Sequence, residues 1–215
     1  MNFNKQILRS IYFIFSIIFS LNVSAQTFQR NVGETKENFI KRIKPVQNAE
    51  IQGEVLEVKQ WNNLANTMFA FYEYTEEGIE KGKPNGLKYS YVDGYLLIPS
   101  ENSRYKKIFI DTYSEEGATA YVESVFFANV DRDADKELGI LCSWDQSMHY
   151  GISGKIYQAY FYDFPKAADK ISKLKPIQVK GFDFEFDGTN DAGERSVAKF
   201  NTTAKIKAEL KRLGF

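Results

Sequence analysis

The chain contains few of the residues from which reactive or cross-linked sites are usually built. Among its 215 residues there is one cysteine, Cys142, and one histidine, His149. A single cysteine cannot form a disulfide within the chain, and a single imidazole excludes a zinc site made of several histidines. No motif supports a nucleophile–base pair between these two residues. Because Cys142 lies in the apolar run 138–142, we expect its thiol to be buried and unreactive.

Signatures of the common enzyme classes are also missing. The sequence has no Gly-x-Ser-x-Gly elbow, no phosphate-cradling loop and no dinucleotide fingerprint. Its 28 acidic residues leave a glycosidase-like pair of carboxylates open, but no pair stands out by position. Enzyme activity therefore has no support from the residues, and we favour a protein that is not an enzyme.

The only long apolar run stands at the beginning of the chain. Lys5 and Arg9 precede an apolar core at residues 11–21, and small residues follow up to Ala25. This arrangement predicts a secretory signal peptide over residues 1–25, with cleavage between Ala25 and Gln26. An uncleaved N-terminal anchor is the alternative, although the run is short for a bilayer crossing. We expect a periplasmic or secreted protein with no membrane span after cleavage.

The chain also lacks an excess of charge of either sign. The chain has 28 basic and 28 acidic residues, and removal of the predicted signal peptide, with Lys5 and Arg9, leaves 26 basic and 28 acidic ones. A nearly neutral surface of mixed sign excludes the basic footprint of a protein that binds nucleic acid or anionic lipid. Residues 26–215 have the length of one domain with a substantial core.

What the sequence does have is many aromatic residues, 13 tyrosines and 18 phenylalanines, often at alternating positions. Alternation with a period of two predicts β-strands. A helix is expected after Thr35, ending near Pro45, and another after Thr202 or Thr203. The fold class predicted is mostly β (α+β), an antiparallel sandwich or incomplete barrel with short N-terminal and C-terminal helices. The strands are expected at residues 52–59, 66–74, 87–92, 95–99, 107–113, 118–128, 138–144, 155–163 and 177–187.

Glycine and polar residues indicate where the chain turns. Asp93-Gly94, between two aromatic runs, predicts a tight β-hairpin. Residues 76–86 are expected to form a long polar loop, and residues 164–175 to contain a turn of helix. An acidic run at 183–191 has the spacing of a calcium loop, yet alternating phenylalanines favour a strand that ends in a turn at Asp187-Gly188.

The most informative segment is an acid-rich loop at 129–137 between two predicted strands. Oxygen-bearing side chains recur at every second position, a spacing that can surround a Ca²⁺ ion with the oxygens it requires. Ala134 stands where such loops usually have glycine, and a Cβ there resists a left-handed conformation. The alternative is a loop without metal, closed by hydrogen bonds or by Lys136 and Arg132. The candidate ligands are Asn129, Asp131, Asp133, Asp135 and Glu137.

A second candidate surface follows the next predicted strand. Trp144, His149 and Tyr150 lie in a loop with small polar residues, a composition that suits contact with a protein or a sugar. The alternative is that Trp144 and Tyr150 cover one end of the core.

Residues 124–163 resemble a module of exported bacterial proteins. Val125-Phe126-Phe127, the alternating acids 129–137 followed by Leu138, an apolar strand, and Tyr157, Tyr160 and Tyr162-Asp163 carry the resemblance. The module is similar to periplasmic immunity proteins that act against lysozyme-like effectors and to inhibitors of invertebrate-type lysozymes. Their Asp-x-Asn-x-Asp-Gly-x-x-Asp-Leu loop binds calcium within a compact β fold. The chain also looks like uncharacterised secreted proteins of Gram-negative bacteria.

The resemblance implies an exported binding or inhibitory module that engages a protein partner in the cell envelope, such as a cell-wall hydrolase, with a structural Ca²⁺ in the loop. Two alternatives stay open. One is a glycan-acting hydrolase that uses paired carboxylates. The other is a structural envelope protein without a small ligand.

Overall fold

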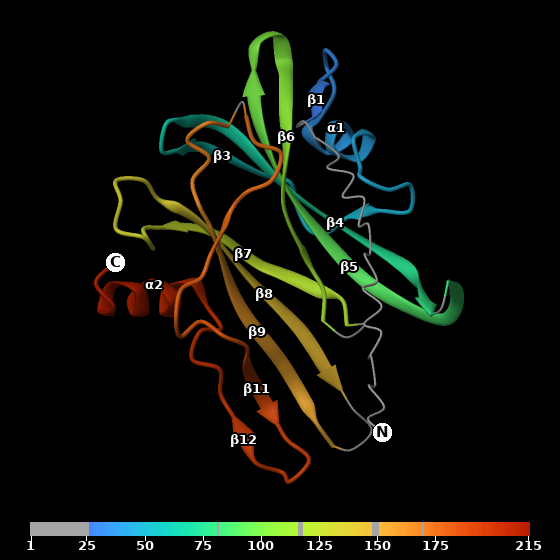
Figure 1. The fold of residues 1–215 in the computed structure, drawn as a ribbon, viewed down its shortest axis with the longest axis vertical. Coiled ribbons are helices and arrows are strands. Elements are labelled where there is room, and N and C mark those ends of the chain that lie inside the picture. The colour runs from blue at the N-terminus through green and yellow to red at the C-terminus, as the bar shows by residue number, and fades with distance from the viewer. Residues whose placement is uncertain (1–25, 81, 116–117, 148–150, 169) are drawn as a thin grey trace, which may run out of the picture.

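The computed structural model describes residues 26–80, 82–115, 118–147, 151–168 and 170–215 (Figure 1). It is mostly β, with 54% strand and 11% helix, in two antiparallel sheets that do not close into a barrel. The predicted fold class is therefore confirmed. The predicted signal peptide lies outside the described residues. Among those residues, no helix is long and apolar enough to span a membrane.

Each sheet has a path of five strands, three of them consecutive in the chain, and a sixth strand that pairs at the side. The first sheet has the order β1 (Gln26–Gln29), β6 (Arg104–Tyr113), β5 (Lys83–Ser100), β4 (Leu64–Glu80), β2 (Glu50–Ile51), with β3 (Leu56–Trp61) also on β4. The second has the order β12 (Arg195–Ser196), β11 (Glu185–Thr189), β9 (Ser153–Tyr162), β8 (Glu137–Ser147), β7 (Ala120–Ala128), with β10 (Pro176–Ile177) on β9. The helices are α1 (Lys36–Arg42), the 3₁₀ turn η1 (Glu101–Ser103) and α2 (Thr203–Arg212).

Central strands of both sheets are buried on both faces, because successive side chains point alternately into two different core clusters. In β4, Phe69 and Phe71 join a core shared with the second sheet, whereas Tyr72 joins a cluster under α1. In β8, Ile140 points into the shared core and Leu141 packs with α2. A strand buried on both faces reads as a continuous apolar run, which accounts for the composition of residues 138–142.

The two predicted helices begin where their capping residues predict. The Thr35 side chain accepts a hydrogen bond from the Asn38 backbone N–H at 3.2 Å. The Thr202 side chain accepts one from the Lys205 N–H at 3.4 Å. Each cap satisfies an N–H group that the first helical turn leaves without a partner. The buried residues Ile206 and Leu210 then fix the inner face of α2.

The hairpin predicted at Asp93-Gly94 is wrong. Strand β5 runs straight through both residues, and its register against β6 shifts between Asp93 and Tyr95, as in a β-bulge. A Cβ on Gly94 would lie 3.0 Å from Cε1 of Phe71, so glycine serves close packing here.

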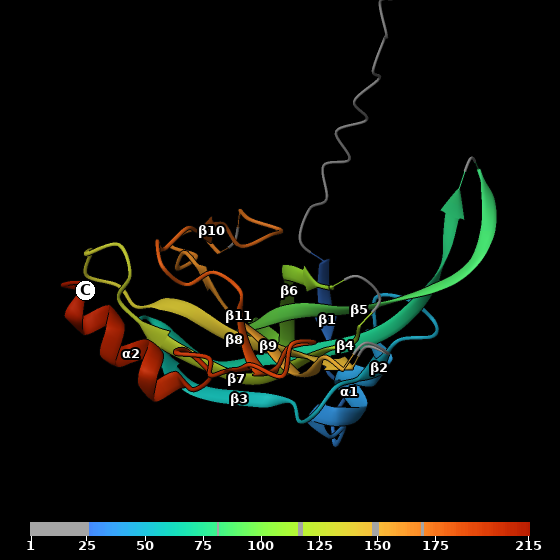
Figure 2. The same cartoon turned by 90° about the horizontal axis from the view of Figure 1, so that it is seen from below.

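The long polar loop predicted at 76–86 is also wrong. These residues continue the β4–β5 ladder, in which Glu77 pairs with Lys88 and Glu80 with Lys83. Opposite charges across the strands stabilise such a ribbon without an apolar core. Figure 2 shows that this ribbon, residues 73–80 and 83–91, projects away from the body of the molecule. We call it the β4–β5 arm.

The turn predicted at Asp187-Gly188 lies further along the chain. Gly188 is inside β11, opposite Gly154 of β9, and a Cβ on Gly188 would lie 2.3 Å from the Ser153 carbonyl oxygen. The chain reverses instead at Asn190, whose Oδ1 accepts hydrogen bonds from the N–H groups of Ala192 and Glu194. The expected strand 177–187 is accordingly divided into β10 and β11.

Residues 164–175, in their described part, contain turns and no α-helix, contrary to the prediction. Their role is to connect the sheets. The Phe109 N–H in β6 donates to the Ser172 carbonyl at 2.9 Å, and the Leu174 N–H donates to the Phe109 carbonyl at 2.9 Å. Because β10, which follows directly, pairs with β9, this segment joins an edge of the first sheet to the second.

A buried lysine attaches α1 to the first sheet. Lys107 is 8% exposed, and its Nζ donates to the carbonyl of Ile43 at the C-terminal end of α1, at 2.6 Å. The same Nζ lies 4.0 Å from the centre of the Tyr95 ring. Burial lowers the pKa of Lys107 to about 8, although Asp93 opposes the shift. A cation at a helix C-terminus and over an aromatic face is doubly stabilised.

We predict that this lysine makes a contribution to stability that rises with pH. Between pH 8 and 10 the folded chain releases the Lys107 proton, whereas an unfolded lysine, with a pKa near 10.4, retains it. The unfolded state then binds more protons at this site, so the Lys107 contribution to the free energy of unfolding increases by roughly 2 kcal/mol over this interval.

Tyrosines such as Tyr72 and Tyr95, whose pKa burial raises, act in the opposite direction in every variant. Urea unfolding at pH 8, 9 and 10 therefore measures the slope of the parent relative to that of K107M. The parent should have the more positive slope, and an equal slope in K107M and in the exposed control K59M would contradict the assignment.

Candidate metal centre

The acid-rich loop joins β7 to β8, as predicted. Ala128 and Glu137 pair at its base, and residues 129–136 form the corner between the two strands. In Figure 1 the loop lies beside the C-terminal end of α2.

Side chains of the loop fold it by capping its own backbone. Oδ1 of Asn129 accepts a hydrogen bond from the Arg132 N–H at 2.8 Å, and its Nδ2 donates to the carbonyl oxygens of Asp133 and Asp135. Asp131 accepts from the Asp133 N–H at 3.1 Å, and Asp133 accepts from the Asp135 N–H at 2.7 Å. Short polar side chains hold tight turns in this way. Asn129 thus closes the loop in this structure.

Three of the five predicted ligands gather. Asp131, Asp133 and Glu137 each place an oxygen so that all three oxygens lie within 4.8 Å of one another. Asp135 points a carboxylate oxygen to Nζ of Lys166, at 3.3 Å, and its carbonyl oxygen is one of the two that accept from Asn129. The sequence thus indicated the acidic segment. It did not show that three of the acids converge while Asn129 closes the loop by hydrogen bonds.

Glu137 is the residue that gives this cluster its chemical character. Its side chain is fully buried; Oε2 accepts a hydrogen bond from the Val130 N–H at 2.7 Å, and Oε1 is buried without a partner. Burial raises the pKa of Glu137 to about 7, and the nearby Asp131 and Asp133 charges add to the effect. A buried carboxylate oxygen that has no donor is unusual in a folded protein. A bound cation would supply the missing partner.

The concern about Ala134 does not apply to this loop. The left-handed conformation is at Arg132, with φ of 68°, and Ala134 is not among the residues with positive φ. Glycine is therefore not required at position 134, where the expectation from calcium loops placed it. The strain of a side chain at positive φ is carried by Arg132, whose guanidinium is held in place by the chain end.

Cations and donors from other elements clamp the loop. Nε1 of Trp61 donates to the Lys136 carbonyl at 2.6 Å, and Asn62 both accepts from the Lys136 N–H and donates to the same carbonyl, each at 3.0 Å. Lys166 forms ion pairs with Asp133 and Asp135. Arg132 donates to the Leu213 carbonyl at 3.3 Å. Lys136 and Arg132 were the cations expected to close a loop without metal. The acids are instead paired with Lys166, and Lys136 contributes its backbone N–H and carbonyl groups.

The donor set fits a hard divalent cation. Ca²⁺ takes six to eight oxygen ligands and accepts carboxylates in one- or two-oxygen contact. Each of the three converging carboxylates offers one oxygen to a common centre, and Glu137 has an oxygen that is buried and unpartnered. Lys166 is largely exposed, so a bound cation can displace its ammonium group from the acids with little loss of buried contact area.

The second acidic run does not form such a cluster. Within the described residues, Asp131, Asp133 and Glu137 are the group of acidic residues that could hold a metal. In the run 183–191, Glu185 accepts from the Phe200 N–H and Asp187 from Asn201, each at 2.9 Å. The interpretation of this run as a strand is confirmed for Glu185–Thr189.

Of the three sequence-predicted contact residues, Trp144 lies in the described part of the chain. Trp144 is fully buried inside β8, with its ring centre 5.8 Å from that of Phe184, so in this structure its ring belongs to the core and not to a contact surface. His149 and Tyr150 lie outside the described residues. Grooves of the described part have pairs of acids on their walls at three places: Glu50 with Glu73, Glu54 with Glu123, and Asp111 with Asp183.

Replacing Asn129 separates closure of the loop from metal binding. N129A removes the side-chain bonds to three backbone groups, so we expect a loss of about 2 kcal/mol in the free energy of unfolding. Because Asn129 acts as a closing residue, the loss should be the same in EDTA and in calcium. Denaturant unfolding of N129A beside the exposed control N63A measures it. A loss that appears only in calcium would make Asn129 a ligand.

Comparison with known proteins adds no relative from which a role could be transferred. No protein-family model, curated protein sequence or solved structure matches the chain. What the loop does is therefore argued from its own geometry: three converging carboxylates, one of them buried with an oxygen that has no donor.

Proposed function

We propose that the protein is an exported, non-catalytic binding module whose β7–β8 loop holds a structural Ca²⁺ ion. The observation that carries the proposal is the side chain of Glu137, whose Oε1 is buried without a donor and which places a carboxylate oxygen within 4.8 Å of oxygens of Asp131 and Asp133. Hydrogen bonds of Asn129 already hold the loop closed. A divalent cation offers a partner to the buried Glu137 carboxylate, and it offsets the repulsion among the three acids.

The position of the ion supports a structural role. Glu137 begins β8 in the second sheet, whereas Trp61 and Asn62, which hold the adjacent Lys136, belong to the β3–β4 corner of the first sheet. Arg132 of the same loop reaches the end of α2. Fixing the loop therefore fixes the contacts among both sheets and the second helix.

A calcium titration tests the metal site. A ligand that binds only the folded state raises the melting temperature. At a concentration about 100 times the dissociation constant the gain is about 2.7 kcal/mol, or roughly 5–10 °C for a chain of this size. E137Q should lose the shift. In EDTA, E137Q should be at least as stable as the parent, because it removes a buried charge.

The exposed control E57Q should keep the full calcium shift. MgCl₂ should give a smaller shift than CaCl₂, since Mg²⁺ requires stricter geometry and loses its water reluctantly. Equal melting temperatures in EDTA and in millimolar CaCl₂ for the parent chain would sink the metal proposal.

The proposed partner is another protein of the cell envelope, and we place its contact on the β4–β5 arm. The arm carries two of the exposed large apolar side chains, Ile79 at 65% and Leu87 at 57% exposure. A two-stranded ribbon has little stability of its own in water. The rings of Tyr74 and Tyr91, tilted against each other with centres 5.6 Å apart, support the arm at its base. A projecting ribbon with exposed apolar side chains is suited to enter a cleft of another protein.

The resemblance of residues 124–163 to lysozyme inhibitors makes a lysozyme-like cell-wall hydrolase the partner class that we propose. In a turbidity assay of cell-wall lysis, the purified chain should slow a sensitive lysozyme. Ile79→Ser together with Leu87→Ser should raise the concentration for half-inhibition about tenfold, because buried apolar contacts are lost on binding.

The matched control is V197S, which removes an exposed apolar side chain away from the arm. It should inhibit as the parent does. Inhibition that is unaffected by the double substitution would place the contact elsewhere, and a chain that protects against no member of a lysozyme panel would remove this partner class.

A further inference from the structure

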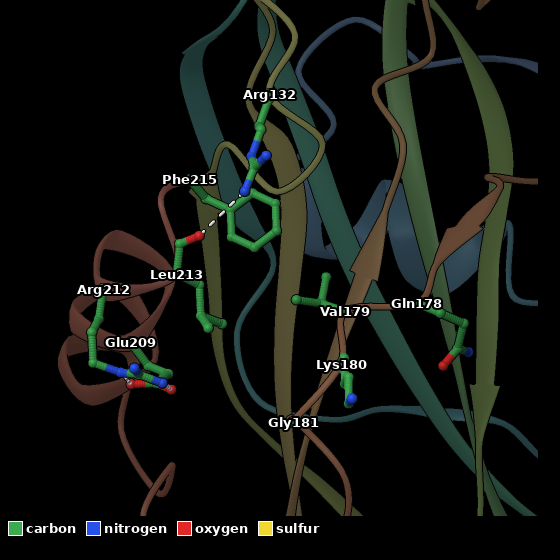
Figure 3. A pocket seen from close by; sticks show the side chains of 9 residues that line it. All are labelled: Arg132, Gln178, Val179, Lys180, Gly181, Glu209, Arg212, Leu213 and Phe215. Atoms are coloured by element: carbon green, nitrogen blue, oxygen red, sulfur yellow. Dashed lines mark hydrogen bonds and ion pairs between the residues drawn. The ribbon is translucent and has the colours of Figure 1, made fainter.

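A groove runs along the last turn of α2, and we call it the α2 groove. Its volume is about 460 Å³, within the range of small-molecule sites. Figure 3 shows its two walls: the end of the α2 region on one side and residues 178–181 on the other, with Arg132 of the acid-rich loop at one end. Neither the metal proposal nor the arm uses this groove.

The floor of the α2 groove is apolar. Val179, Leu213 and Phe215 line it, and each is a partly buried margin of the core cluster that contains Ile206 and Leu210. An apolar group in the groove would therefore continue an existing core and would not lie on an isolated patch. Removal of that apolar surface from water supplies most of the affinity in such sites.

Some of the charged side chains at the rim of the α2 groove form an ion pair, and others have no carboxylate partner. Glu209 is neutralised by Arg212, which contacts both of its carboxylate oxygens at 2.5 and 2.7 Å. Lys180 is exposed and makes no hydrogen bond or ion pair with the described residues. The groove therefore presents two cations, Arg132 and Lys180, that have no carboxylate partner within its lining.

Arg132 is held in place before any ligand arrives. Its backbone N–H is bonded to Asn129, its Nη2 donates to the Leu213 carbonyl at 3.3 Å, and its guanidinium lies 5.3 Å from the centre of the Phe215 ring. A guanidinium has five N–H donors, so this arrangement leaves donors for an anion. A donor fixed in advance loses less entropy when the ligand binds.

We infer that the α2 groove binds a small amphipathic anion, an aryl or short acyl group that carries one carboxylate or sulfonate. The apolar part packs on Val179, Leu213 and Phe215, and the anionic group contacts Arg132, while Lys180 on the facing wall attracts it from a longer distance. The complementary charge and the apolar floor select this class over a neutral lipid, which leaves both cations unused, and over a sugar, which leaves the floor without an apolar partner.

Two fluorescent probes that differ in charge test the inference. The anionic probe is 8-anilinonaphthalene-1-sulfonate, and N-phenyl-1-naphthylamine is its counterpart without the sulfonate. Titrations of the purified chain are run in EDTA, so their outcome does not depend on whether the loop binds Ca²⁺. The sulfonate probe should bind at least about fivefold more tightly, as expected for one charge-assisted contact. 4-Phenylbutyrate should displace it, and 4-phenylbutan-1-ol should not.

Variants locate the site. K180Q and R132Q should each weaken the sulfonate probe about fivefold and change the binding of the neutral probe less than twofold. V179D should weaken both probes, because it places a charge on the apolar floor. K59Q, an exposed lysine on β3, is the matched control and should change neither. Melting curves of all variants confirm that they are folded.

Equal affinity for the two probes would overturn the inference, since the cations would then have no role. An effect of K59Q as large as that of K180Q would mean that the probe follows net charge and not this groove. Displacement by the alcohol as effective as by the carboxylate would also count against it.

Discussion

The indole of Trp61 is the contact on which the two-sheet arrangement depends. It stands at the end of β3 in the first sheet, yet its ring is stacked on Phe127 of β7 at 5.1 Å and meets the edge of Phe164 at 5.1 Å. Its Nε1 donates to the carbonyl of Lys136. One side chain thus combines a large buried apolar surface with the hydrogen bond that places the acid-rich loop, and such aromatic anchors dominate the energetics of cores.

The buried polar groups divide into those that the fold satisfies and those that it does not. Lys107 has a carbonyl and aromatic faces around it, and Asp93 has the hydroxyl of Thr112 at 2.6 Å. Among the described residues, five side-chain atoms are buried without a partner, on Thr67, Tyr113, Glu137, Trp144 and Gln158. Glu137 differs from the other four because its atom belongs to a carboxyl group that two further acids approach. A complete buried network rigidifies a core, and the unpartnered carboxylate oxygen is the reason why we propose a cation for this loop.

Much of the fold could be predicted from local patterns. The alternation of apolar residues and the capping residues Thr35 and Thr202 indicated strands and helices because their causes lie within a few residues. Asp93-Gly94 failed, because β5 continues through these residues between β4 and β6, and pairing with those strands is not visible in the local sequence. The loop's acids were visible as a motif. Its clamps Trp61, Asn62 and Lys166 were not, because nothing local marks a contact between residues 33 to 75 positions apart.

The continuity of β4 has a mechanical consequence. This strand of 17 residues begins at the corner next to Trp61, passes through the core and ends at the tip of the arm. A load applied along the tip is carried lengthwise by β4 and β5 and opposed by their neighbours β3 and β6, so whole ladders must slide at once before anything separates. Shear of this kind breaks many hydrogen bonds together, whereas peeling breaks them singly. A molecule bound to the arm therefore transmits force to the central strands of the first sheet, and not to a segment that can separate from it alone.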